Sequence, residues 1–318
     1  MKSIFCRTIM SMLSLGLSML MTFNVLLPQI WAQEVERDQK FSLSVTVKAI
    51  NLLAAVVDQK GKVVHNLKKE DFVLWEDDQK QIISHFITHE QAPLSIAVLL
   101  DSSGSMSYSG KLSNSKLIIE RLAKSLNRKD EMALFTFSEL FVRTKVPFTR
   151  DKELIIRKLS TVKSGGNTAL YQALHFMPQI MGEPQNRQAI LLFTDGIDNQ
   201  SIISLTQVVK NTRQMQIPIY SLGFAFKAKK NRTPPVDYAF TEILETIASD
   251  TGGRYFELAN AEELAPSIKN IMTELRYQYL IGYYSNQRAQ PGTYHTLRLE
   301  TTNKEYRVKT RKGYYIAE

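Results

Sequence analysis

A group of oxygen-bearing side chains follows an apolar segment about a third of the way along the chain. Residues 96–100 are wholly apolar, and Asp101, Ser103 and Ser105 come directly after them. A carboxylate at the end of a buried strand is costly unless something compensates its charge. The three side chains alternate along a tight loop that Gly104 permits, so their oxygens can point toward one place. This spacing favours a site that binds a cation.

Two further positions offer oxygen ligands to the same cation. Asp195 ends a second apolar run, and Thr168 follows the flexible pair Gly165 and Gly166. All the candidate ligands are hard oxygens, which suit Mg²⁺ or Mn²⁺ rather than zinc or copper. Two carboxylates leave a divalent site near neutral, with at least one octahedral position open. The alternative interpretation is that the hydroxyl groups only cap the next turn of the chain.

The segment that must position these residues alternates strand-like and helix-like patterns. Continuous apolar runs at 94–100 and 188–194 are typical of strands that are covered on both faces. Helical spacing of apolar residues follows at 111–127, 167–181 and 261–275. This alternation predicts an α/β fold, a doubly wound and mostly parallel sheet, over residues 94–277. Because ligands bind beyond the carboxyl ends of such strands, the two aspartates are expected to converge there.

The same residues carry a family resemblance. The stretches "DSSGS", "GGNTAL" and "TDGIDN" resemble, in this order, the metal-ion-dependent adhesion site (MIDAS) of the von Willebrand factor type A (VWA) domain. The resemblance spans about residues 94–275 and assigns the metal ligands to five positions: Asp101, Ser103, Ser105, Thr168 and Asp195. It implies that the open metal position accepts an acidic side chain from a partner protein.

The segments on either side of this domain have a different pattern. Residues 33–93 and 278–318 contain short alternating runs with turn residues between them, about four strands before the domain and about three after it. Neither flank is large enough to be comfortably stable by itself. We therefore expect one small β-sandwich, made by both flanks, into which the VWA domain is inserted. "VHNLKKEDFVLWEDDQKQIISHF" and "YLIGYY" also resemble the flanks of bacterial VWFA-related proteins, a group often met in Acidobacteria.

The first 32 residues look like a secretory signal peptide that is cut after Ala32. An uncleaved membrane anchor is the alternative. Cys6 is the only cysteine and lies in this leader, so a cleaved protein has neither disulfides nor thiolate metal sites. These features predict a secreted or periplasmic protein without a membrane span after cleavage. The formal net charge is +9, but the basic residues are scattered, which argues against a nucleic-acid partner.

Three functions remain open from the sequence. We expect a secreted adhesion-type module that binds a protein partner through an exposed acidic residue of that partner, and we do not expect an enzyme. The first alternative is a cell-envelope scaffold in which the metal is purely structural. The second is an Mg²⁺-dependent phosphoester hydrolase, although the sequence offers no general base beside the site.

Several other residues invite a functional interpretation and receive a plainer one. Asp198 is expected to be an exposed loop acid rather than a support for the metal ligands. His85 and His89 are expected on the surface, because four residues of strand separate them too widely to share a metal. The tyrosines between residues 277 and 284 are expected to pack within a sheet rather than to stack on a carbohydrate.

Overall fold

The structure is a computed structural model that describes residues 49–88, 92–182, 186–195, 198–224, 236–258, 264–287 and 290–316. The chain divides into two compact units, residues 1–45 and 46–318, and all the described residues lie in the second. Three features predicted from the sequence lie outside the described residues: the signal peptide, His89, and residues 41–47, whose alternating apolar and polar side chains predict a strand. Among the described helices, none combines the length and the apolar character that crossing a membrane requires.

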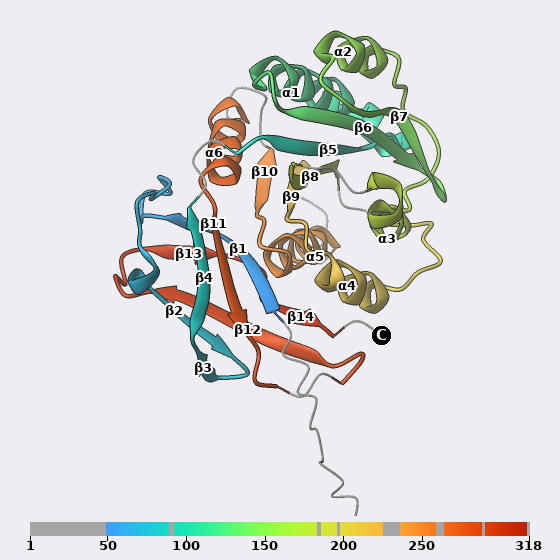
Figure 1. The fold of residues 1–318 in the computed structure, drawn as a ribbon. Helices are drawn as coiled ribbons and strands as arrows, with labels where there is room; N and C mark the ends of the chain where they lie inside the picture. Colours follow the sequence, from blue (N-terminus) through green and yellow to red (C-terminus); the bar gives the residue numbers. More distant parts are fainter. Residues whose placement is uncertain are drawn as a thin grey trace, which may run out of the picture. The chain divides into compact units, whose positions relative to one another are not determined.

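A six-stranded sheet forms the centre of the α/β domain (Figure 1). Its strands are β5 (Leu94–Asp101), β6 (Glu131–Ser138), β7 (Phe141–Thr149), β8 (Arg187–Thr194), β9 (Ile219–Phe224) and β10 (Tyr255–Leu258). Their order is β10-β9-β8-β5-β6-β7, and every neighbouring pair is parallel except β6 and β7. The predicted doubly wound and mostly parallel sheet is confirmed.

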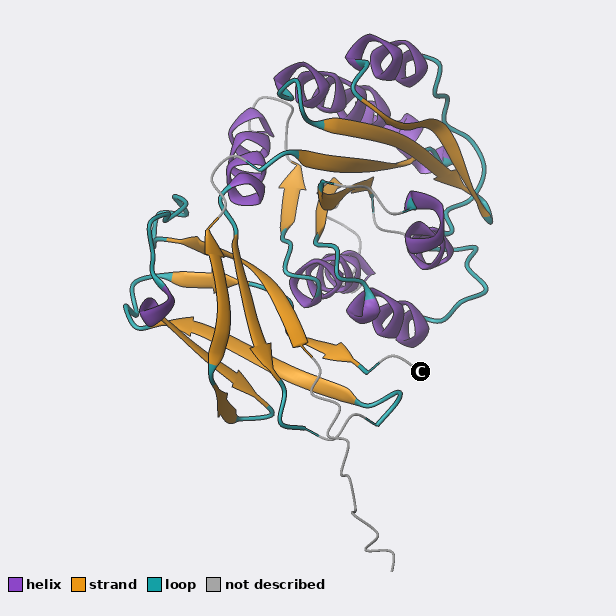
Figure 2. Ribbon diagram, viewed as in Figure 1, coloured by secondary structure: helices purple, strands orange, loops and turns teal. Residues whose placement is uncertain are grey.

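Helices cover both faces of this sheet (Figure 2). One face packs against α1 (Lys111–Ser125), α2 (Lys152–Ser160) and α6 (Leu264–Arg276). The other face packs against α3 (Leu170–Met181), α4 (Leu205–Gln214) and α5 (Val236–Asp250).

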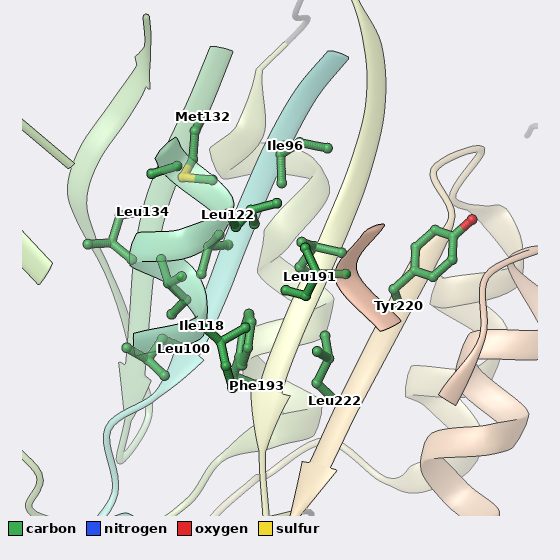
Figure 3. Packing of buried hydrophobic residues seen from close by; sticks show 14 of the residues in the cluster. Ile96, Leu100, Ile118, Leu122, Met132, Leu134, Leu191, Phe193, Tyr220 and Leu222 are labelled. Carbon is green, nitrogen blue, oxygen red and sulfur yellow. The ribbon is translucent and has the colours of Figure 1, made fainter. Parts of the chain in front are cut away.

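Strand β5 shows why the continuous apolar run was informative. Ile96 and Leu100 point to the α1 side, where Figure 3 shows them beside Leu122 and Ile118, whereas Leu99 belongs to the core under α3. Since successive residues of a strand face opposite sides, a strand buried on both faces is expected to be apolar along most of its length.

Two four-stranded antiparallel sheets form the β-sandwich. The first has the order β13-β1-β11-β4, and the second has the order β14-β12-β2-β3. The amino-terminal flank supplies β1 (Ala49–Val57), β2 (Phe72–Glu76), β3 (Gln79–Gln81) and β4 (Ile83–Thr88), with a short 3-10 helix at Lys69–Asp71. The carboxyl-terminal flank supplies β11 (Tyr279–Tyr284), β12 (Tyr294–Thr301), β13 (Arg307–Lys309) and β14 (Gly313–Tyr315).

The two flanks interleave within each sheet. Strand β1 lies between β11 and β13, β4 pairs with β11, and β2 pairs with β12. The sandwich expected from the two flanks is therefore confirmed. Eight sandwich strands lie within the described residues. The alternating pattern of residues 306–315 predicts one strand, but the structure divides this stretch into β13 in one sheet and β14 in the other.

Two of the tyrosines between residues 277 and 284 pack within the sandwich as expected, whereas Tyr284 is 45 % exposed. Tyr279 and Tyr283 are buried in the sandwich core, and Phe72 packs against Tyr279 with ring centroids 5.2 Å apart. His85 is exposed, and its Nε2 lies 3.2 Å from the hydroxyl of Tyr284.

Candidate metal centre

The two candidate carboxylates lie at the carboxyl ends of adjacent strands. Asp101 is the last residue of β5, and Asp195 directly follows β8. The two strands are parallel neighbours whose register pairs Leu100 with Phe193. Parallel pairing brings the strand ends to the same edge of the sheet, and the charge of Asp195 acts on Asp101 there. The expected convergence of the two aspartates is thus a direct result of the strand order.

The loop after β5 gathers its oxygens around Asp101. The amide of Ser103 donates to Asp101 Oδ1 over 2.8 Å, and the hydroxyls of Ser103 and Ser105 lie 3.1 Å apart. The amide of Ser102 continues the pairing with β6 by donating to the carbonyl of Phe137 over 2.8 Å. From there the chain leaves the sheet as a 3-10 helix, Gly104–Gly110.

The loop that carries Thr168 is hydrogen-bonded to the loop after β5. The amide of Gly104 donates to the carbonyl of Gly166, and the amide of Gly165 donates to the carbonyl of Ser102, both over 2.8 Å. Gly166 has a φ of +78°, a left-handed conformation that favours glycine, and a Cβ at this position would lie 2.9 Å from the side chain of Glu139. Thr168 is 2 % exposed and lies two residues beyond this contact.

The electrostatics around Asp101 favour a cation. Burial raises the pKa of its carboxyl to about 6, although hydrogen bonds from Ser103 and from Thr194 lower it, and the charge of Asp195 raises it further. The Thr194 hydroxyl donates to Asp101 Oδ2 over 2.7 Å. A carboxylate that is fully buried, next to a second carboxylate, lacks the solvation that its charge requires. A bound cation would compensate for this missing solvation.

Asp195 has one oxygen occupied and the other without a partner. Its Oδ2 accepts a hydrogen bond and forms an ion pair with Lys111 Nζ over 2.8 Å. Its Oδ1 is buried and has no hydrogen-bond partner among the residues that the structure describes. A buried carboxylate oxygen that is left unpaired costs free energy, so its presence in a native fold calls for an explanation. A metal ion on Oδ1 is the explanation that the neighbouring ligands favour.

Three residues near the site were not found, or were misjudged, from the sequence. Thr194 and Lys111 were not proposed, because their contacts with Asp101 and Asp195 depend on the fold rather than on spacing. Asp198 was expected to be an exposed loop acid, and this expectation is wrong. It is half-buried, and its Oδ2 accepts hydrogen bonds from the Tyr171 amide over 2.8 Å and from the Ser201 hydroxyl over 2.6 Å. It therefore supports the start of α3, next to Thr168.

The donor set fits a hard divalent cation. In the part of the chain that the structure describes, no three histidine, cysteine or acidic side chains gather into a group able to hold a metal ion. A centre at Asp101 and Asp195 would therefore need hydroxyl oxygens to complete it. Ser103 is 1 % exposed and contacts Asp101, and Ser105 is half-buried with its hydroxyl beside that of Ser103. Carboxylate and hydroxyl oxygens together suit Mg²⁺ or Mn²⁺.

Comparisons with known proteins identify the family of this chain. The von Willebrand factor type A domain model matches residues 95–272. A search of curated proteins gives no match.

Two solved structures with a TM-score of 0.50 have a similar fold at low sequence identity. A von Willebrand factor type A protein from Catenulispora acidiphila matches with a TM-score of 0.50 and 11 % identity, covering 86 % of this chain and 74 % of that one. Proximal thread matrix protein 1 from the mussel byssus, in a structure with a zinc-occupied MIDAS motif, matches with a TM-score of 0.50 and 16 % identity. That match covers 64 % of this chain and half of the mussel protein. An aerotolerance-related membrane protein from Bacteroides fragilis is 19 % identical, with a TM-score of 0.44, over 57 % of this chain and 98 % of that one.

Proposed function

Because this chain belongs to the von Willebrand factor type A domain family, we propose that it is a secreted, metal-dependent protein-binding module of a bacterial cell envelope. Asp101, Ser103, Ser105, Thr168 and Asp195 would hold one Mg²⁺ or Mn²⁺. The open position of the ion would accept an acidic side chain from a partner protein. The observation that carries this proposal is the buried and unpartnered Oδ1 of Asp195, at the strand edge that it shares with Asp101.

The bound ion would supply a positive charge that an acidic side chain of the partner can ligate. Residues of this chain would orient the ligands and hold the loops of the site together. The Ser103 amide and the Thr194 hydroxyl hold the Asp101 carboxylate in one orientation. The hydrogen bonds between the Gly104 and Gly166 loops keep the hydroxyl-bearing segments together, so little ordering remains to be done when a ligand binds.

The surface around the site suits a protein partner. Three large apolar side chains are exposed on its loops: Tyr108 at 70 %, Phe141 at 60 % and Ile202 at 80 %. Tyr108 lies in the loop after β5, and Phe141 follows the β6 turn, where the Glu139 amide donates to the carbonyl of Asn167. Ile202 follows Ser201, whose hydroxyl accepts from the amide of Gln172. Exposed aromatic and aliphatic side chains around a polar centre are typical of protein interfaces.

Metal binding is the first prediction to test. We expect Asp101→Asn and Asp195→Asn each to reduce Mg²⁺ affinity at least a hundredfold, because each removes a charged oxygen ligand from a site with only two. Isothermal titration calorimetry on the folded variants measures this. Asp78→Asn is the matched control, since its side chain is 93 % exposed in a turn of the sandwich. Unchanged Mg²⁺ binding in either site variant would show that the assigned centre is wrong.

Partner binding is tested with the same variants. The protein is immobilised and exposed to extracts of the producing cells in Mg²⁺, in EDTA, and as the Asp101→Asn variant. We expect a partner that is retained only by the wild-type protein in Mg²⁺. A protein that binds Mg²⁺ but retains its partners equally well in all three conditions would favour a scaffold with a structural metal. Hydrolysis of a phosphoester in Mg²⁺, lost in Asp101→Asn, would favour an enzyme instead.

A further inference from the structure

The side chain of Lys111 is in direct contact with one of the candidate metal ligands. Its Nζ lies 2.8 Å from Asp195 Oδ2, and the side chains of the pair are 7 % and 0 % exposed. Water screens a pair this deeply buried only weakly, so the positive charge acts on anything else bound to the same carboxylate. The ammonium contacts Oδ2 and leaves Oδ1, the unpartnered oxygen, for a metal ion.

The backbone just before Lys111 has an unusual conformation. Lys111 is the first residue of α1 and follows Ser109 and Gly110, which have φ values of +54° and +69°. A left-handed conformation costs free energy for a serine, so this turn is not the most stable way to begin the helix. A cation at the amino end of a helix is also disfavoured by the helix dipole. Helix stability therefore does not explain a lysine here, whereas its contact with Asp195 does.

We infer that Lys111 sets the charge of the loaded centre and thereby couples metal binding to the binding of a carboxylate ligand. This inference rests on the proposed function. With Asp101, Asp195 and a divalent ion alone, the formal charges cancel. With the Lys111 ammonium included, the loaded centre carries one positive charge in a poorly hydrated place, and an anionic ligand would neutralise it.

Two consequences follow from this charge. The metal by itself binds more weakly than it would without Lys111, because the ammonium repels it. A carboxylate ligand strengthens metal binding, and by thermodynamic reciprocity the metal strengthens carboxylate binding by the same factor. The centre would then bind its ion firmly only when an acidic partner is engaged.

The experiment measures Mn²⁺ affinity by calorimetry, with and without acetate as the carboxylate probe. We expect Lys111→Met to bind Mn²⁺ at least tenfold more tightly than the wild type, equivalent to about 1.4 kcal/mol. Acetate should tighten Mn²⁺ binding in the wild type and have a smaller effect in Lys111→Met. Lys129→Met is the control for net charge, because Lys129 is exposed in the turn before β6, at the opposite edge of the sheet.

Two more variants separate charge from structure. Lys111→Arg keeps the charge and should bind Mn²⁺ like the wild type, while Lys111→Gln is a second neutral variant and should bind more tightly. If Lys111 had only a structural role, both neutral variants would bind Mn²⁺ equally or more weakly, and this result would overturn the inference while leaving the proposed metal centre intact. If neither the wild type nor any variant binds Mn²⁺, the proposed centre itself is wrong.

Discussion

Asp101, Asp195 and Asp130 are buried carboxylates of the α/β domain, and their charges are compensated to different degrees. Asp101 accepts hydrogen bonds from neutral donors, and Asp195 is paired with Lys111. Asp130 forms two hydrogen bonds with the Arg276 guanidinium, over 3.2 and 2.6 Å, and also accepts from the amides of Leu94 and Asn127. Only Asp130 has its charge and both its oxygens satisfied, which marks it as structural.

The pH dependence of stability tests this role of Asp130. Burial alone would raise the pKa of its carboxyl, but the hydrogen bonds from Arg276 and the two amides outweigh burial and hold the pKa below its usual 3.8. A lowered folded-state pKa contributes stability that is present above the unfolded value and is lost as the pH falls through the folded value. We expect Asp130→Asn to lower the free energy of unfolding by about 3 kcal/mol near neutral pH, because it leaves Arg276 largely buried and unpaired.

Urea denaturation of the wild type and of Asp130→Asn over a pH series measures the effect. The difference in the free energy of unfolding between the two proteins should be constant from neutral pH down to about 4 and should become smaller below that value. The exposed Asp78→Asn variant should remain close to the wild type throughout. A gap between wild type and Asp130→Asn that stays equally wide in strong acid would contradict the charge-based account.

At the scale of elements, two helices of the same sheet begin in different ways. Asp151, the residue before α2, accepts from the amide of Leu154 over 2.8 Å, which is a local cap that the sequence already indicates. Helix α3 follows Ala169, which has no capping side chain. Asp198 and Ser201, from the loop after β8, accept from the Tyr171 and Gln172 amides instead. A cap supplied from so far along the chain cannot be predicted by spacing, which is why Asp198 was misjudged.

The two caps give a matched pair of variants. Asp198→Ala and Asp151→Ala should each lower the free energy of unfolding by about 1 to 2 kcal/mol, since each leaves helix amides without an acceptor. Only Asp198→Ala should also weaken Mg²⁺ binding, severalfold, because its loop holds the start of α3 next to Thr168. Urea denaturation and calorimetry measure the two effects. Equal Mg²⁺ affinity in both variants would show that the cap does not support the site.

At the scale of the whole molecule, the order of strands and helices could be predicted from the sequence, whereas individual contacts between distant residues could not. Strands such as β5 and β8 were recognisable because burial on both faces requires an unbroken apolar run, and the positions of Asp101 and Asp195 followed from their ends. The division of the last strand was not recognisable. Residues 310–312 connect β13 in one sheet to β14 in the other. Lys111 was missed for a related reason, because its partner lies 84 residues away.

The interleaving of the flanks leads to a prediction about truncation. A chain that ends at Tyr277 lacks β11 to β14, so β1 loses both its neighbours and β4 loses its partner. It also lacks Lys309, which pairs with the fully buried Glu274 of α6, so Glu274→Gln is added to the truncated chain to avoid an unpaired buried charge. We expect hydrogen exchange to find the amides of β1 and β4 unprotected, and those of β5 and β8 still protected. The full-length Glu274→Gln protein is the control, in which all four strands should stay protected. Protected amides in β1 of the truncated chain would mean that the amino-terminal strands fold without the tail, and that the tail only adds to a sandwich that is already formed.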